Sequence, residues 1–200
     1  MGRRRLACFA LPALLIAGAG CGNERNQPTG LQQLGEQISL VNFSAPGGDV
    51  SFGRPSTWIV TGGTLPKVAQ ISSGSAVATV FAYPRSDLPQ DAVGAEASRQ
   101  RLIGSLRQRS PSFEVESSRV REVGGSVAVE IVGRGKVAGE PVRTKSVHVY
   151  KGTAEYVIDA YARPKLFRRA ETEAFNPLLA TIRLGGFPEG PVTGGVAAEG

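Results

Sequence analysis

Residues 113–161 read FEVESSRVREVGGSVAVEIVGRGKVAGEPVRTKSVHVYKGTAEYVIDAY. Apolar and polar residues alternate through this run, and a period of two is typical of β-strands with one buried face. Three glycine-containing segments interrupt the alternation, at Gly124-Gly125, Gly133–Gly139 and Lys151-Gly152. Such segments indicate turns. The run therefore predicts four consecutive strands joined by turns in an antiparallel meander.

The same alternation predicts which side chains share a face of each strand. The expected groups, in chain order, are Phe113 with Val115 and Ser117; Val127 with Val129 and Ile131; Val147 with Val149; and Tyr156 with Ile158 and Ala160.

Shorter strand signals precede this run. They are Ile38–Phe43, Val50–Phe52, Trp58–Val60, Val68–Ile71 and Ala76–Tyr83. The last two flank the turn-forming residues 72–75 and predict a hairpin that Pro84 ends.

Two segments have the pattern of amphipathic helices. The first begins at Asp87 as N-cap with Pro89 in its first turn and runs to about Arg109, before Pro111. Its apolar stripe is Ala92, Ala95, Leu102, Ile103 and Leu106.

The second helical segment follows Pro164 and is expected to break or restart at Pro177 before reaching Leu184. Its apolar positions are Leu166, Phe167, Ala170, Ala174, Phe175, Leu178, Leu179 and Ile182. The order of strands, helix, strand meander and helix predicts an α+β fold, with helices packed on an antiparallel sheet.

The start of the chain has the pattern of an export signal. Arg3–Arg5 precede 15 uncharged, mostly apolar residues, Leu6–Gly20. That run is shorter than the roughly 20 residues of a membrane-spanning helix, which favours a secretory signal peptide. Small residues lead up to Cys21 in the sequence IAGAGC, the pattern that a bacterial lipoprotein signal peptidase accepts.

We therefore expect residues 1–20 to be removed and the Cys21 thiol to carry diacylglycerol, which anchors the chain in membrane lipid on the extracytoplasmic face of the cell membrane. Two other interpretations stay open: a secretory signal cut nearby, and a plain apolar anchor. Residues 22–37 read as a flexible tether, 38–184 as one globular domain, and 185–200, rich in Gly and Pro, as a disordered tail.

Removal of residues 1–20 changes the charge of the protein. The full chain has 23 basic and 17 acidic residues and a net charge of +6, whereas loss of Arg3–Arg5 leaves 20 basic residues and a net charge of +3. This modest charge, without aromatic residues interleaved among the basic ones, does not indicate a nucleic-acid partner. Cys8 is lost as well, so lipidation of Cys21 leaves no free thiol for catalysis.

Three segments resemble those of PsbP-like bacterial lipoproteins of the LpqN type. They are Phe52–Trp58 (FGRPSTW), His148–Ala162 and Phe175–Leu184 (FNPLLATIRL), and the resemblance spans most of residues 38–184. It implies an antiparallel sheet sandwiched by helices, and a binding or assembly role in the cell envelope without a shared catalytic set. Because the chain lacks the histidines that ligate metal in some members, we expect no metal and no cofactor.

His148 is the single histidine of the chain, so any triad would have to use it. It lies opposite the Val147 and Val149 face of its strand, where we expect a half-exposed residue that contacts Asp159 across the sheet. No Gly-x-Ser-x-Gly motif accompanies it. The sequence therefore predicts no catalytic residues, and a hydrolase is the least favoured of the functions considered.

Two groups of residues are candidate binding sites. Arg99, Arg101, Arg107 and Arg109 on the first helix are candidates for contact with an anionic lipid surface; the alternative is a solvated helix face. Trp58, Phe81, Tyr83, Tyr156 and Tyr161 are candidates for an apolar pocket between sheet and helix; the alternative is that they fill the core.

The sequence leaves two functions open. The first is a non-enzymatic, membrane-anchored module that binds another envelope protein or supports assembly. The second is a carrier that holds a small apolar ligand or lipid in a cleft between sheet and helix.

Overall fold

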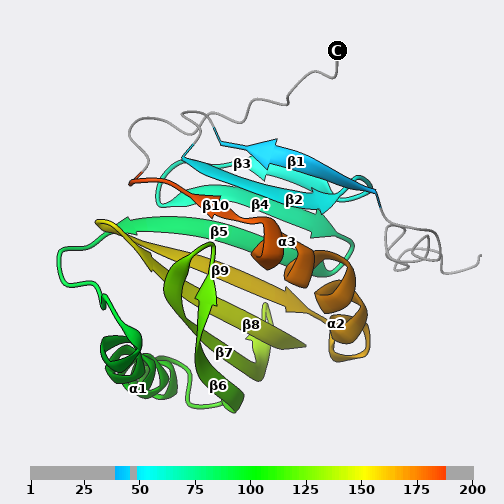
Figure 1. Ribbon diagram of the computed structural model, residues 1–200. Helices are drawn as coiled ribbons and strands as arrows, with labels where there is room; N and C mark the ends of the chain where they lie inside the picture. The colour runs from blue at the N-terminus through cyan, green and yellow to red at the C-terminus, as the bar shows by residue number, and fades with distance from the viewer. Residues whose placement is uncertain (1–38, 46–48, 188–200) are drawn as a thin grey trace, which may run out of the picture.

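A computed structural model describes residues 39–45 and 49–187 (Figure 1). The predicted signal peptide, Cys21 and the tether lie outside the described residues. The strands are β1 (Leu40–Ser44), β2 (Val50–Pro55), β3 (Ile59–Gly62), β4 (Lys67–Ser73), β5 (Ala76–Pro84), β6 (Glu114–Val123), β7 (Ser126–Val137), β8 (Glu140–Lys151), β9 (Ala154–Ala162) and β10 (Arg183–Leu184). The helical segments are α1 (Ala92–Arg109), α2 (Pro164–Ala170), the π-helical turn η2 (Glu171–Phe175) and α3 (Asn176–Thr181).

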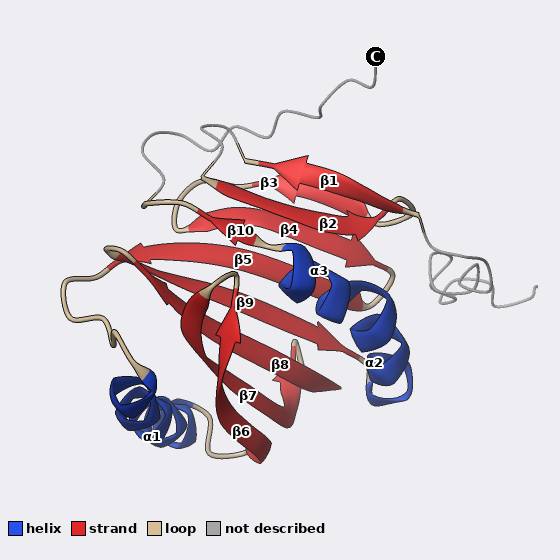
Figure 2. Ribbon diagram, viewed as in Figure 1, coloured by secondary structure: helices blue, strands red, loops and turns tan. Residues whose placement is uncertain are grey.

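Seven strands form one antiparallel sheet in the order β3-β4-β5-β9-β8-β7-β6 (Figure 2). The predicted meander supplies β6 to β9, and the predicted hairpin supplies β4 and β5. A smaller sheet, β1-β2-β10, packs beside α3. The chain is therefore an α+β protein with helices packed on antiparallel sheets, as the sequence predicted.

One face of the large sheet carries the main core. Val147, Val149 and Ile158 point to this face and are buried with residues of α2, η2 and α3. Trp58 packs edge-on against Phe175, with ring centroids 5.9 Å apart, and Phe167 lies 6.0 Å from Phe175. These rings join the helices to the sheet.

The opposite face is covered only in part. Ala95 and Ile103 of α1 pack on Val129, Ile131 and Tyr150 in a second, smaller core. Six strand spacings of about 4.8 Å make the sheet about 29 Å wide, whereas a helix is about 10–12 Å across. Since α1 lies over β6 and β7 and reaches β8 only at Tyr150, no helix covers the rest of this face of β8 or the same face of β9 and β5.

The first helix begins later than predicted. Asp91, and not Asp87, is its N-cap, and the Asp91 side chain accepts a 2.8 Å hydrogen bond from the backbone N–H of Gly94. Residues 85–91 instead form a connection over the end of the sheet. Arg107 and Arg109 lie in the last turn, where positive charge is favourable to the helix dipole.

The second helix continues through Pro177 instead of breaking there. The π-helical turn η2 precedes the proline, with the Asn176 N–H donating to the Glu171 carbonyl five residues back. This wider turn lets the chain pass a residue that has no N–H. The helix ends at Thr181, earlier than the predicted Leu184, because Arg183 and Leu184 pair with β2.

The predicted turn at Gly133–Gly139 is wrong for most of its length, because β7 runs on to Val137 and only Ala138-Gly139 turn. Gly133 and Gly135 are strand residues that make room for the ring of Phe113. A Cβ at Gly133 would lie 2.6 Å from Phe113 Cε1, and one at Gly135 would lie 2.8 Å from Phe113 Cδ2. Gly135 thus allows a close approach of the Phe113 ring, and Gly133 allows that of the same ring and of the Glu114 carbonyl oxygen, which would lie 2.5 Å from a Cβ at Gly133.

The predicted face of β6 is also corrected. An irregularity in the β6–β7 pairing falls between Val115 and Ser117 and shifts the alternation by one residue. Consequently Ser118, and not Ser117, shares the α1 face with Val115; the Ser118 hydroxyl accepts a hydrogen bond from Arg99 of α1.

Residues beyond the predicted end of the domain are also placed. The Gly185 N–H donates to the Asp49 carbonyl at 2.6 Å, the Tyr156 hydroxyl donates to the Gly186 carbonyl, and Phe187 packs against the main core. The ordered domain therefore extends at least to Phe187.

Replacing Phe167 by alanine tests the aromatic contact between helices and sheet. Phe167 is fully buried, so Phe167→Ala should lower the free energy of unfolding by about 3–5 kcal/mol. Ile59→Ala, at a side chain that is 67% exposed on edge strand β3, should change it by less than about 0.5 kcal/mol. Urea unfolding measures both, and equal effects would contradict this assignment of the core.

Candidate functional site

A groove of about 650 Å³ lies beside α1 on the uncovered face of the sheet. Leu102 and Leu106 of α1 form one wall, and Phe113 lines the groove after the helix ends. The lining strand residues include Phe81 and Tyr83 from β5, Val157, Asp159 and Tyr161 from β9, Ser146 and His148 from β8, and Ile131 from β7. The volume is within the usual range of small-molecule sites.

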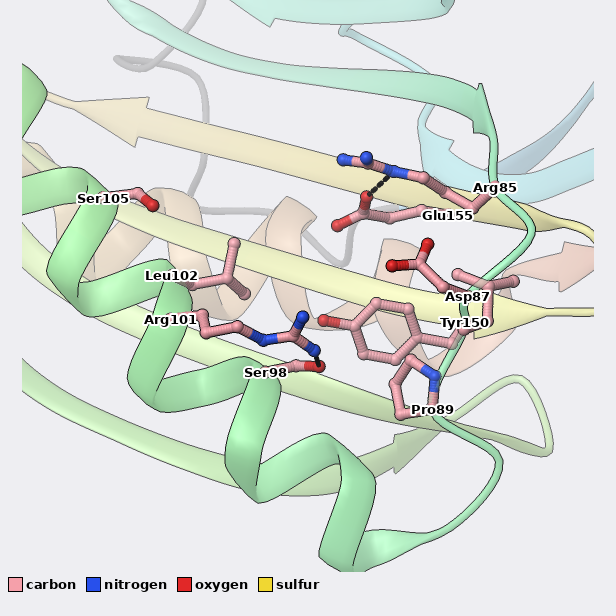
Figure 3. A pocket seen from close by; sticks show the side chains of 10 residues that line it. Arg85, Asp87, Pro89, Ser98, Arg101, Leu102, Ser105, Tyr150 and Glu155 are labelled. Atoms are coloured by element: carbon pink, nitrogen blue, oxygen red, sulfur yellow. Dashed lines mark hydrogen bonds and ion pairs between the residues drawn. The ribbon is translucent and has the colours of Figure 1, made fainter.

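A smaller pocket of about 160 Å³ adjoins the groove near the start of α1 (Figure 3). Ser98, Arg101 and Ser105 face it from the helix, and Tyr150 faces it from β8. Burial raises the pKa of Tyr150 to about 12, with the charge of Glu155 adding to the effect, so the hydroxyl remains protonated at neutral pH.

Glu155 lines both the pocket and the groove, and each of its carboxylate oxygens has a side-chain partner. Its Oε2 accepts from Arg85 Nε at 2.9 Å, and its Oε1 lies 2.8 Å from His148 Nδ1. Burial by itself would raise the pKa of Glu155, but the hydrogen bonds and charges of His148 and Arg85 outweigh it, so the pKa lies below its ordinary value of 4.5.

The hydrogen-bonded chain continues along the floor of the groove. His148 Nε2 lies 3.3 Å from the Ser146 hydroxyl, which donates to Asp159 Oδ1 at 2.5 Å. His148 therefore faces an acceptor at each ring nitrogen. The predicted contact of His148 with Asp159 is bridged by Ser146, and the His148 side chain, 15% exposed, is more buried than expected.

Ser146, His148 and Glu155 have the connectivity of a serine-hydrolase triad but not its geometry. The Ser146 hydroxyl donates to Asp159 rather than to the more distant His148 nitrogen. Ser146 also lies within β8, which pairs with β7 and β9 on its two sides. The nearby backbone N–H groups are therefore committed to the sheet and do not form an oxyanion hole.

The five aromatic residues that the sequence suggested for one pocket lie on two faces of the sheet. Phe81, Tyr83 and Tyr161 line the groove, and the rings of Phe81 and Tyr83 stack with centroids 6.2 Å apart. Trp58 and Tyr156 are not pocket residues, because both are buried in the core on the opposite face.

The four arginines of α1 do not share one face either. At 100° per residue, Arg99 and Arg107 fall on one flank of the buried stripe, and Arg101 and Arg109 fall on the other. Arg99 forms an ion pair with Glu96 and a hydrogen bond with Ser118 of β6. Arg101 lines the small pocket and Arg109 lines the groove.

Several residues of the site were not predicted from the sequence, among them the ion pair of Arg85 and Glu155. The sequence pattern could have indicated Glu155. Glu155, Val157 and Asp159 occupy every second position of β9, so their side chains lie on the same face of the strand, the groove face. Nothing local marks Arg85, which follows the end of β5 and reaches Glu155 only through the pairing of β5 with β9.

Among the described residues, no group of three or more His, Cys, Asp or Glu side chains is arranged to hold a metal ion. Within the same residues, no helix combines the length and the apolar character that a membrane span requires.

Comparison with known proteins identifies the fold. No family model and no curated protein matches the sequence. The structure resembles cyanobacterial PsbP (CyanoP) from Synechocystis sp. PCC 6803, with a TM-score of 0.55 and 12% identity over 74% of this chain and 94% of CyanoP.

Two further solved structures are similar. The Ran-binding protein Mog1p of Saccharomyces cerevisiae has a TM-score of 0.50 and 7% identity over 74% of this chain and 96% of its own. LpqN of Mycobacterium tuberculosis, involved in cell envelope biogenesis, has a TM-score of 0.46 and 16% identity over 78% of this chain and 88% of its own. The likeness to CyanoP confirms the PsbP-like fold that the sequence resemblance implied.

Replacing Glu155 by glutamine tests its ion pairs through the pH dependence of stability. A pKa that is lower in the folded than in the unfolded state contributes stability above about pH 4.5, and this contribution is lost as the pH falls through the folded pKa. Glu155→Gln should cost about 1–3 kcal/mol at pH 7, and the difference from wild type should shrink below pH 4.5.

Thermal or urea unfolding between pH 3 and pH 7 gives the comparison. Glu122→Gln is the matched control, because the Glu122 side chain is exposed and has no ion pair among the described residues. A constant difference between Glu155→Gln and wild type across this range would show that Glu155 is not held ionised by its partners.

Proposed function

We propose that this protein is a non-enzymatic binding module, anchored to the outer face of the cell membrane through lipid on Cys21, and that the groove beside α1 is its binding site. The observation that carries the proposal is the groove itself. It is about 650 Å³ in volume and combines an apolar wall at Leu102 and Leu106 with polar groups fixed on the opposite floor. This combination is typical of ligand sites.

The hydrogen bonds that the polar groups of the groove make with one another favour a binding role over a catalytic one. Glu155 is held by Arg85 and His148, and the Ser146 proton is directed at Asp159. A nucleophile needs an adjacent base that is free to accept its proton. Mog1p, which has the same overall fold, is named for binding Ran, so this fold is compatible with a binding role.

The anchor supports a function close to the membrane surface. Diacylglycerol supplies two chains, which hold a protein in a membrane more firmly than one. Residues 22–37, as a flexible linker of 16 residues, would span a root-mean-square distance of about 20–24 Å. The domain would then reach ligands or proteins near the headgroup layer.

The sequence left two kinds of binding open, binding of another protein and carriage of a small ligand. The volume and concave shape of the groove favour carriage of a small ligand. A partner protein that docks elsewhere, as in assembly support, would leave the groove free. Altering the groove should therefore abolish binding of a small ligand but not binding of a partner protein that docks elsewhere.

Mass spectrometry of the protein extracted from membranes in mild detergent tests the proposal. We expect a chain that begins at Cys21 and is heavier by one diacylglycerol, and under native conditions an additional non-covalent mass. Leu106→Glu places a charge in the groove wall and should remove this mass. Gln108→Glu, at an exposed residue of the same helix, should retain it.

Two results would contradict the proposal. A chain that begins elsewhere without lipid would refute the anchor. A bound mass that Leu106→Glu retains, or a protein partner bound equally to both variants, would place the binding site outside the groove.

A further inference from the structure

We infer that the groove and the adjoining pocket together bind a single-chain anionic amphiphile, a molecule with one apolar chain and one negatively charged headgroup. The inference rests on the proposed function, which makes the groove a binding site. It adds the chemical class of the ligand and the residues that select it.

The groove and the pocket form one continuous track along α1. Arg85, Leu102 and Glu155 line both of them, so the two volumes meet at these residues. From Ser98 to Arg109 the helix advances 11 residues, about 16 Å at 1.5 Å per residue. A track of this length suits one extended chain.

The apolar side chains are placed along the middle of the track. Leu102 and Leu106 line it from the helix, and Val157, Phe81 and Phe113 line it from the sheet side. Contact with these groups would remove the methylene groups of a chain from water, which favours binding of an apolar chain.

The buried carboxylate on the track, Glu155, is already paired. Its two oxygens are engaged by Arg85 and His148. Asp159, which accepts the Ser146 hydroxyl, and Asp87, at the pocket, have no basic side chain within 4.0 Å among the described residues, but both are exposed, so water and salt screen their charges. Glu155 therefore leaves no unpaired buried charge for a cationic ligand.

Two arginines on the track, Arg101 and Arg109, are exposed and have only a hydrogen bond each within their own helix. Arg101 Nη2 donates to the Ser98 hydroxyl at 3.0 Å, and Arg109 Nε donates to the Ser105 carbonyl at 3.4 Å. Neither has a carboxylate within 4.0 Å among the described residues, whereas Arg85, on the same track, forms an ion pair with Glu155. Arg101 and Arg109 can therefore form charge-assisted hydrogen bonds with an anionic ligand.

The small pocket is the better place for the headgroup. Arg101 stands there beside the protonated Tyr150 hydroxyl, a further donor for a carboxylate or phosphate, and Ser105 lines the same pocket one helical turn further along α1 (Figure 3). The chain would then extend along Leu102 and Leu106 toward Phe113, with Arg109 at the far end of the track.

Photo-crosslinking tests the inference on the lipid-anchored protein in its membrane. The probes are dodecanoate and dodecylamine, each carrying a diazirine near the end of the chain, and labelled peptides are mapped by mass spectrometry. We expect dodecanoate to label peptides within residues 98–113 and 144–161, and dodecylamine to label them at least about tenfold less.

Substitutions in α1 test the role of the arginines. Arg101→Gln should lower dodecanoate labelling of these peptides by about tenfold, and Arg109→Gln should lower it less. Arg107→Gln is the matched control, because Arg107 is exposed on the other flank of the same helix, and it should label as wild type does.

The outcomes separate the inference from the proposed function. Equal labelling of the groove by both probes, unaffected by Arg101→Gln, would overturn selection of an anion but keep the groove as a binding site. Absence of groove labelling by either probe would overturn the amphiphile class. The proposed function would still be decided by the mass that Leu106→Glu removes or retains.

Discussion

The alternation of side chains along β7, β8 and β9 decides which residues reach each face of the seven-stranded sheet. Val147 and Val149 point into the main core under α2 and α3, while Ser146 and His148, one residue away from them, point into the groove. A shift of one residue in strand register would exchange these two sets. The buried apolar face therefore fixes the positions of the polar groups on the other face.

The groove exists because α1 covers only part of the second face of the seven-stranded sheet. On this face a single helix covers two strands of the seven-stranded sheet and part of a third, and the uncovered remainder would otherwise present isolated charges next to apolar surface. The structure resolves this by pairing Glu155 with Arg85 and His148 and by bonding Ser146 to Asp159. The resulting floor is polar but internally satisfied, which suits recognition more than chemistry.

Local patterns in the sequence predicted the strands, the helices and the fold class, because alternation and helical periodicity are set by near neighbours. The predictions failed where the role of a residue depends on contacts with residues far away in the sequence. Gly133 and Gly135 look like turn residues until Phe113 is seen to lie over them. Trp58 and Tyr156 look like partners of Tyr83 until the strand faces are known. Arg85 and Glu155 lie 70 residues apart and meet only through strand pairing.

Hydrogen–deuterium exchange, with and without dodecanoate, tests most directly whether ligand binds between α1 and the sheet. The structure predicts slower exchange in α1 and in the connection at residues 85–91, with little change in α2 and α3, which lie on the opposite face. Protection confined to α2, α3 or β1 and β2 would contradict the assignment of the groove as the binding site.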